Sequence, residues 1–123
     1  MFLVYLDEKA WEALGPEEQQ RQMAQCQPHA TAMAASGKML GGAPLHPTSQ
    51  AVTVGFREGR RLITDGPFAE TKEQLGGYAL IEAVDQAEAI RIAEGFVGEQ
   101  SLSRIEVRPI VDLTAESRKE EKR

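Results

Sequence analysis

A chain of 123 residues, 41% hydrophobic and 27% charged, has the size and composition of a single globular domain. The net charge of −5 argues against nucleic acid as a partner, and no apolar run approaches the roughly 20 residues of a membrane helix. No secretory leader pattern is present, and the single cysteine, Cys26, cannot form an internal disulfide. We therefore expect a cytoplasmic protein that binds neither membrane nor nucleic acid.

The first third of the chain predicts a strand followed by a long helix. Residues 1–6 form a continuous apolar run, which is typical of a central strand. The helix is expected to begin at Pro16, because proline suits the first helical position and acidic residues follow it. Apolar residues then recur at helical spacing as far as Gly37, the expected left-handed cap. Pro28 lies inside this pattern and predicts a kink or a break.

The middle of the chain predicts a short strand and a hairpin. Residues 38–45 read as a glycine-containing strand that runs into a loop. Residues 52–57 alternate apolar and polar side chains, which predicts a half-buried strand. Residues 58–59 are Glu-Gly, a two-residue hairpin turn, and residues 60–64 are expected to return from it.

The last third predicts a strand, a helix and an edge strand. Residues 78–84 are apolar on both faces, so this strand is expected to be central and covered on both sides. Asp85, with a glutamate three residues later, predicts a helix start, and Gly98 its end. Residues 104–111 alternate again, and Pro109 predicts that this strand lies at or near an edge.

The order of these elements predicts an α+β fold, a ferredoxin-like βαββαβ protomer with an extra hairpin. The domain is expected to span residues 1–111, followed by a charged, disordered tail at 112–123. Two helices can cover only one face of a four-stranded sheet. Because residues 78–84 are apolar on both sides, we expect a second copy of the chain to cover the other face in a homodimer.

The segment between residues 64 and 78 is the candidate site, because it concentrates charged and turn-forming residues. Gly66-Pro67 is a turn signal, since proline fixes its own φ and biases the preceding residue toward extended conformations. Phe68 is expected to anchor this turn on the core, and residues 70–75 to make one or two helical turns. A rigid backbone would then display four charged side chains: Asp65, Glu70, Lys72 and Glu73.

Residues 65–78, Asp65-Gly66-Pro67-Phe68-Ala69-Glu70-Thr71-Lys72-Glu73-Gln74-Leu75-Gly76-Gly77-Tyr78, resemble the DGPF motif over its whole length. The flanks at residues 2–5, 41–42 and 107–110 agree with it as well. The chain thus resembles the DGPF-domain proteins of the YCII-related family. The resemblance implies a dimeric α+β barrel. It also implies a histidine–aspartate pair, here His29 and Asp65, and an accessory role beside extracytoplasmic-function sigma factors.

Each candidate residue also has a structural interpretation. Asp65 is either a pocket carboxylate acting as a base or a cap of its own turn. Glu70 and Lys72 either bind a ligand or form a solvated turn, in which Lys72 pairs with a neighbouring acid. His29 is either catalytic or a packing residue at the edge of the helix's apolar face. Arg108 either binds a carboxylate in a dimer cavity or forms a cross-strand ion pair with Glu82 or Glu106.

Two functions remain open on these grounds. The first is a small-molecule binder or cofactor-independent acid–base enzyme, with its pocket at the signature and no metal or cofactor, since no motif supplies either. The second is a non-catalytic accessory or regulatory dimer, linked to a sigma-factor pathway. A carboxylate in a concave pocket would favour the first, and a solvated signature loop would favour the second.

Overall fold

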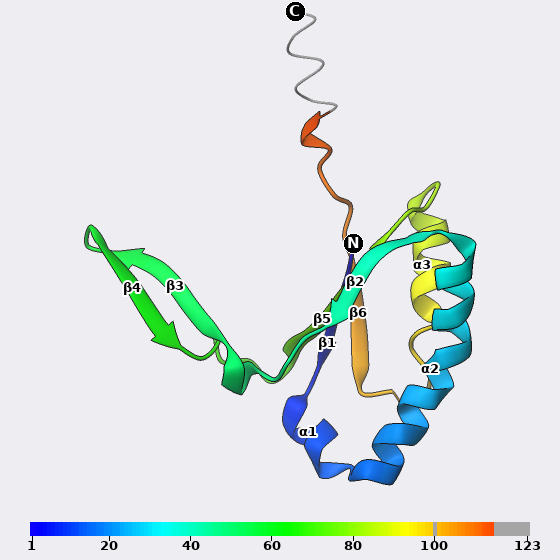
Figure 1. The fold of residues 1–123 in the computed structure, drawn as a ribbon, viewed down its shortest axis with the longest axis horizontal. Coiled ribbons are helices and arrows are strands. Elements are labelled where there is room, and N and C mark those ends of the chain that lie inside the picture. Colours follow the sequence, from blue (N-terminus) through cyan, green and yellow to red (C-terminus); the bar gives the residue numbers. More distant parts are fainter. Residues whose placement is uncertain (100, 115–123) are drawn as a thin grey trace, which may run out of the picture.

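A computed structural model describes residues 1–99 and 101–114 of the chain, and Figure 1 shows their arrangement. A four-stranded antiparallel sheet, in the order β2-β5-β1-β6, has α2 and α3 against one face, and a separate hairpin of β3 and β4 extends away from it (Figure 1). This confirms the predicted α+β, ferredoxin-like fold. The elements are β1 (Phe2–Leu6), α1 (Glu8–Ala13), α2 (Pro16–Ser36), β2 (Met39–Pro44), the 3₁₀ turn η1 (Thr48–Gln50), β3 (Val52–Arg57), β4 (Arg60–Asp65), β5 (Gln74–Ile81), α3 (Gln86–Glu94) and β6 (Ser103–Val107).

The core lies between the sheet and the two helices. β1 is a central strand, as predicted, and Phe2 pairs with Ala79 of β5 and Val107 of β6. The Phe2 side chain is 2% exposed, and it packs with residues of both helices. Because side chains alternate along a strand, every second residue of β1 points to the helices and the others point to the helix-free face. The core is completed by Met33, Ala79, Ile92 and Ala93.

The long helix α2 has the predicted ends. It begins at Pro16 and ends before Gly37, which has a φ of 75° and is therefore in the left-handed region that favours glycine. Of the kink or break predicted at Pro28, the break is wrong, because α2 is continuous through this residue. Proline removes only one backbone donor, and the many other bonds of a 21-residue helix remain. The short helix α1 was not predicted; the carboxylate of Asp7 caps it by accepting the Ala10 N–H at 3.1 Å.

The second long helix, α3, begins as predicted and ends earlier. Asp85 is its N-cap, and the carboxylate accepts the Glu88 N–H at 2.8 Å. The helix ends at Glu94 instead of continuing to Gly98. The carbonyl of Ile92 would accept the N–H of Phe96 in a continuing helix, but it lies 2.8 Å from Nε2 of His29 and accepts the N–H of Gly95.

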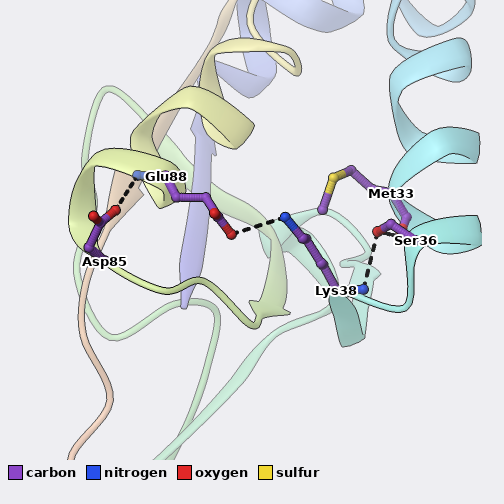
Figure 2. A network of polar contacts seen from close by, with 5 residues as sticks. All are labelled: Met33, Ser36, Lys38, Asp85 and Glu88. Carbon is purple, nitrogen blue, oxygen red and sulfur yellow. Dashed lines mark hydrogen bonds and ion pairs between the residues drawn. The ribbon is translucent and has the colours of Figure 1, made fainter.

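A polar network ties the end of α2 to the start of α3 (Figure 2). The Ser36 hydroxyl donates to the Met33 carbonyl at 2.7 Å and accepts the Lys38 N–H at 3.2 Å. The Lys38 ammonium then reaches the carboxylate of Glu88 at 3.1 Å, and the backbone of Glu88 is held by Asp85. The end of α2 and the start of α3 are therefore joined by an ion pair and hydrogen bonds as well as by packing.

The hairpin has the predicted turn but not the predicted burial. Glu58 and Gly59 have φ values of 53° and 77°, as a two-residue turn with positive φ at both positions requires. The apolar residues of β3 are exposed instead of half-buried; Val54 is 64% exposed and Phe56 is 70% exposed. The reason is that the hairpin projects from the four-stranded sheet (Figure 1), and no other helix or strand of the described residues covers its apolar side chains.

The remaining predictions are met in part. β5 is central, as expected, but it spans Gln74–Ile81 instead of residues 78–84. The helical turns predicted at residues 70–75 are wrong, because Gln74 and Leu75 pair with β1 and so belong to the strand. β6 lies at an edge, as predicted, but it ends at Val107 instead of continuing through Pro109 to residue 111. The predicted tail lies outside the described residues from residue 115 onward and stays a prediction.

Candidate functional site

The signature turn is held by backbone contacts with the start of β3. Gly66 has a φ of 95°, its N–H donates to the Ala51 carbonyl at 2.7 Å, and its carbonyl accepts the Thr53 hydroxyl at 2.8 Å. Phe68 does not anchor the turn, because its side chain is 90% exposed. The prediction that Phe68 anchors the turn on the core of its own chain is therefore wrong. The turn is ordered by Gly66, whose positive φ suits glycine, and not by burial of the aromatic ring.

Three of the four charged residues of the signature are exposed to solvent, and the fourth forms an ion pair. Asp65, Glu70 and Lys72 are exposed, and their side chains make no hydrogen bond or ion pair with any other described residue. The self-capping interpretation of Asp65 and the pairing of Lys72 with an acid are therefore not observed. Glu73 is partnered instead by Arg104 of β6, with 3.4 Å between the charged atoms. Four cavities of the described chain are lined by residues outside the signature.

The two signature glycines have a packing role in the sheet. A Cβ atom at Gly76 would lie 2.5 Å from Cδ2 of Leu6, and one at Gly77 would lie 3.3 Å from the carbonyl oxygen of Ala43. At these two positions, the Leu6 side chain of β1 and the backbone of β2 lie so close to β5 that a side chain there would crowd them. Gly76 and Gly77 let the signature segment enter the centre of the sheet.

His29 is a contact between helices and lies apart from the signature. Its Nε2 atom is 2.8 Å from the Ile92 carbonyl, and its ring meets Phe96 edge to face with 4.4 Å between centroids. The helix α2 lies against one face of the sheet, whereas the hairpin that ends at Asp65 extends away from the helices (Figure 1). The structure therefore does not bring His29 and Asp65 together as a pair, and the packing interpretation of His29 describes its contacts.

Arg108 follows the ion-pair interpretation. Its Nε donates to Oε1 of Glu106 at 2.8 Å, and a second guanidinium nitrogen contacts the same oxygen. This hydrogen bond and the charge of Glu106 hold the pKa of the Arg108 guanidinium above its ordinary value. Glu106 lies two residues earlier in β6, which ends at Val107, so the pair lies at the sheet edge and does not join two strands. Arg108 is thus already satisfied by a carboxylate of its own chain.

One hollow of the described chain is a feature that the sequence interpretation missed. A cavity of about 410 Å³ lies between α2 and the helix-facing side of the sheet. Phe2 and Ala79 are buried residues of its lining, whereas Met23 is 64% exposed. Cys26 also lines it, and its thiol donates to the Phe96 carbonyl at 3.2 Å. The helical spacing of Met23 and Cys26 indicated an apolar face but could not show that this face stands off from the sheet.

A family model described as the YCII-related domain matches residues 1–114. The chain belongs to the YCII-related family. A curated protein of Rhizobium meliloti (strain 1021), named only as uncharacterized, is 37% identical over 109 residues, which cover 88% of each chain. The likeness thus extends over nearly the whole of this YCII-related chain, but the relative's name assigns no reaction or ligand.

The described part of this YCII-related chain has few groups that suit a bound metal. Within residues 1–99 and 101–114, no cluster of three or more histidine, cysteine, aspartate or glutamate residues is placed to hold an ion. None of the helices in the same residues has the length and apolar character that crossing a membrane requires. The features of chemical interest are therefore the exposed signature, the exposed hairpin and the apolar cavity.

Proposed function

We propose that this YCII-related chain is a cytoplasmic accessory or regulatory module that acts as a homodimer, with the hairpin and the helix-free face of the sheet as its interface. The observation that carries the proposal is the exposure of the hairpin's apolar side. Folding normally removes such side chains from water, and a contiguous exposed apolar surface marks an interaction site. The resemblance to DGPF-domain proteins supports a sigma-factor pathway as the setting in which such a dimer works.

The apolar residues of the hairpin gather on one of its two sides. Val54 pairs directly with Ile63, so both side chains point to the same side, and Val52 and Phe56 follow by alternation. Ile63 is 65% exposed, close to the value for Val54. The same side also carries Asp65, which pairs with Val52, and Arg61, which pairs with Phe56, whereas the opposite side carries Thr53, Gly55, Arg57, Arg60, Leu62 and Thr64. Four exposed apolar side chains gathered on one side, with a charge at each end, form a surface that a partner chain would cover.

The helix-free face of the sheet supplies a second apolar surface on the same chain. Leu3 pairs with Tyr78, and Tyr5 pairs with Leu75, so these four side chains share the face opposite to Phe2. Tyr78 is 41% exposed although it belongs to a central strand. A second copy related by a two-fold axis can cover both surfaces at once, because each chain offers the same pair.

A matched pair of neighbouring substitutions tests the dimer. In Ile63→Lys, a charge enters the apolar side of the hairpin, and we expect dimer dissociation to become at least about 30-fold more favourable, equivalent to about 2 kcal/mol. Leu62→Lys places the same charge on the opposite side and is expected to leave the dimer unchanged. Sedimentation equilibrium on the wild-type protein and the two variants gives their dimer dissociation constants. A monomeric wild-type chain, or equal effects of both substitutions, would refute the proposed interface.

The second candidate is ligand binding or acid–base chemistry at the signature, with Asp65 as the base and Glu70 and Lys72 as binding groups. It is supported by the absence of side-chain partners for these three residues within the described chain. A second copy would have to provide the missing wall of the pocket. A metabolite screen by thermal shift, repeated on Asp65→Asn, tests it, because a ligand of the folded state raises the melting temperature. Shifts that survive in Asp65→Asn would rule this site out.

A further inference from the structure

We propose that the cavity between α2 and the sheet is a binding site for an uncharged, largely apolar small molecule. The cavity lies on the helix-covered side of the sheet, so the site is separate from the dimer surface proposed above. Its volume of about 410 Å³ falls within the range of small-molecule pockets. Protein interiors contain few voids larger than a water molecule, so a hollow of this size between two layers requires an explanation.

The walls favour an apolar body with at least one flat side. Phe2 and Ala79 are buried in the sheet, and Ile105 of β6 lies beside them. Two aromatic rings, Trp11 and Phe96, contribute further apolar surface. Small side chains such as Ala79 leave the space open, where a larger aliphatic residue would fill it. The site is therefore a hollow that the chain's own side chains do not close.

The charge of the lining selects against ions. Among residues 1–99 and 101–114, no aspartate, glutamate, lysine, arginine or histidine lines the cavity. An ionised ligand would lose its hydration there and find no opposite charge, which is strongly unfavourable. The polar groups present are neutral; they include the amide of Gln22 and the hydroxyls of Ser101 and Ser103. A neutral ligand with a hydrogen-bonding edge matches this surface.

The rim offers a route of entry. Met23, Gln27 and Pro44 line the cavity and are exposed, so the opening lies between α2 and β2. Methionine is unbranched and flexible, and it can move aside at little cost. Cys26 lies on the same wall as Met23 and is partly exposed. As the single cysteine of the chain, it reports directly on whether the cavity is occupied.

The probes are two dyes with the same body. N-phenyl-1-naphthylamine is uncharged, and 1-anilinonaphthalene-8-sulfonate adds a sulfonate to the same anilinonaphthalene frame. We expect the neutral dye to bind with one site per chain and to slow the reaction of Cys26 with a disulfide reagent at least about tenfold. The anionic dye should bind at least about tenfold more weakly, because the lining carries no cation.

Two filling substitutions, one in each layer, locate the site. Gln22→Phe on α2 and Ser103→Leu on β6 should each weaken binding of the neutral dye at least about tenfold, as measured by fluorescence titration of protein with unchanged circular dichroism. Gln20→Phe adds the same ring to an exposed position of α2 outside the lining and should bind the dye normally. Using two layers keeps the test valid if one variant fails to fold.

The proposal is overturned by any of three results: no protection of Cys26, equal binding of the two dyes, or normal dye binding in a folded filling variant. Repeating the titration on Ile63→Lys separates this site from the dimer. Binding that persists in that variant supports a cavity within one chain. Binding that is lost there, with the fold retained, places the dye at the dimer surface and refutes the proposal.

Discussion

The contact between His29 and Gly95 allows a sharp test of how α2 and α3 are joined. Gly95 has an ordinary helical φ of −67°, so its backbone does not require glycine. What requires glycine is the neighbour: a Cβ atom at this position would lie 2.4 Å from both Cε1 and Nε2 of the His29 ring. We expect Gly95→Ala to destabilise the fold only as long as the histidine ring is present.

The expected loss of stability in Gly95→Ala follows from the contacts that the displaced His29 ring would lose. Displacing it breaks the 2.8 Å hydrogen bond to the Ile92 carbonyl, which contributes about 1 kcal/mol, and the edge contact with Phe96, which contributes about 0.5–1.5 kcal/mol. Alanine returns up to about 1 kcal/mol, because it reduces the conformational entropy of the unfolded chain at a position whose φ it can adopt. Gly95→Ala should therefore cost about 1 kcal/mol in the native background. In His29→Ala it should be neutral or stabilising by up to about 1 kcal/mol.

The assay is a double-mutant cycle by urea denaturation, with all four proteins at one concentration because dimerisation would otherwise shift the midpoints. His29→Ala alone is expected to cost about 2 kcal/mol, from the same two contacts. The coupling energy should be about 1–2 kcal/mol, above the scatter of about 0.5 kcal/mol expected for independent sites. A coupling below that scatter would mean that the ring does not hold the two helices together, and the reasoning would fail.

Three further predictions concern other local devices. Asp85→Ala should cost about 1 kcal/mol in urea denaturation by removing the α3 cap, and Asp85→Asn should cost clearly less. Gly42→Ala should destabilise the fold by more than about 2 kcal/mol, because the φ of Gly42 is 151° and the new Cβ would lie 2.6 Å from the Tyr78 carbonyl oxygen. Gly76→Ala should destabilise it less in the same assay, because its closest contact is the end of the flexible Leu6 side chain. A hydrogen bond from Arg21 holds the pKa of Glu18 below its ordinary value, so its stabilising contribution is present at neutral pH and is lost as the pH falls through the folded-state value. Glu18→Gln should therefore narrow the stability difference between neutral and acid conditions; an unchanged difference would contradict this.

Local signals in the sequence were sufficient for most elements. The cap at Asp85, the left-handed Gly37 and the Glu58-Gly59 turn each depend on a few adjacent residues, and all three occur as predicted. The early end of α3 was not predictable in this way. It depends on His29, a residue 63 positions away from Ile92, which occupies the carbonyl that the next helical bond would use.

The candidate site was less predictable because its surroundings are not local. Phe68 was expected to be buried on the strength of its size, but burial depends on a neighbour, and none is within the described chain. The cavity behind Cys26 results from the spacing between two layers, which no short pattern encodes. The resemblance to DGPF-domain proteins predicted the YCII-related family and an α+β fold, and both are confirmed, but the signature did not disclose a pocket.

The separation of the hairpin from the core has a consequence for how the molecule opens. β3 and β4 pair with each other and not with the four-stranded sheet, and their apolar side chains stay outside the core. Their amides can therefore exchange with solvent through opening of the hairpin alone, without unfolding of the sheet. In an isolated chain, amide exchange should show two levels of protection, low in β3 and β4 and high in β1 and β5. If a second copy covers the hairpin, the protection of the β3 and β4 amides should increase with protein concentration while that of the β1 amides stays the same. Amide exchange in the hairpin would therefore report dimer formation.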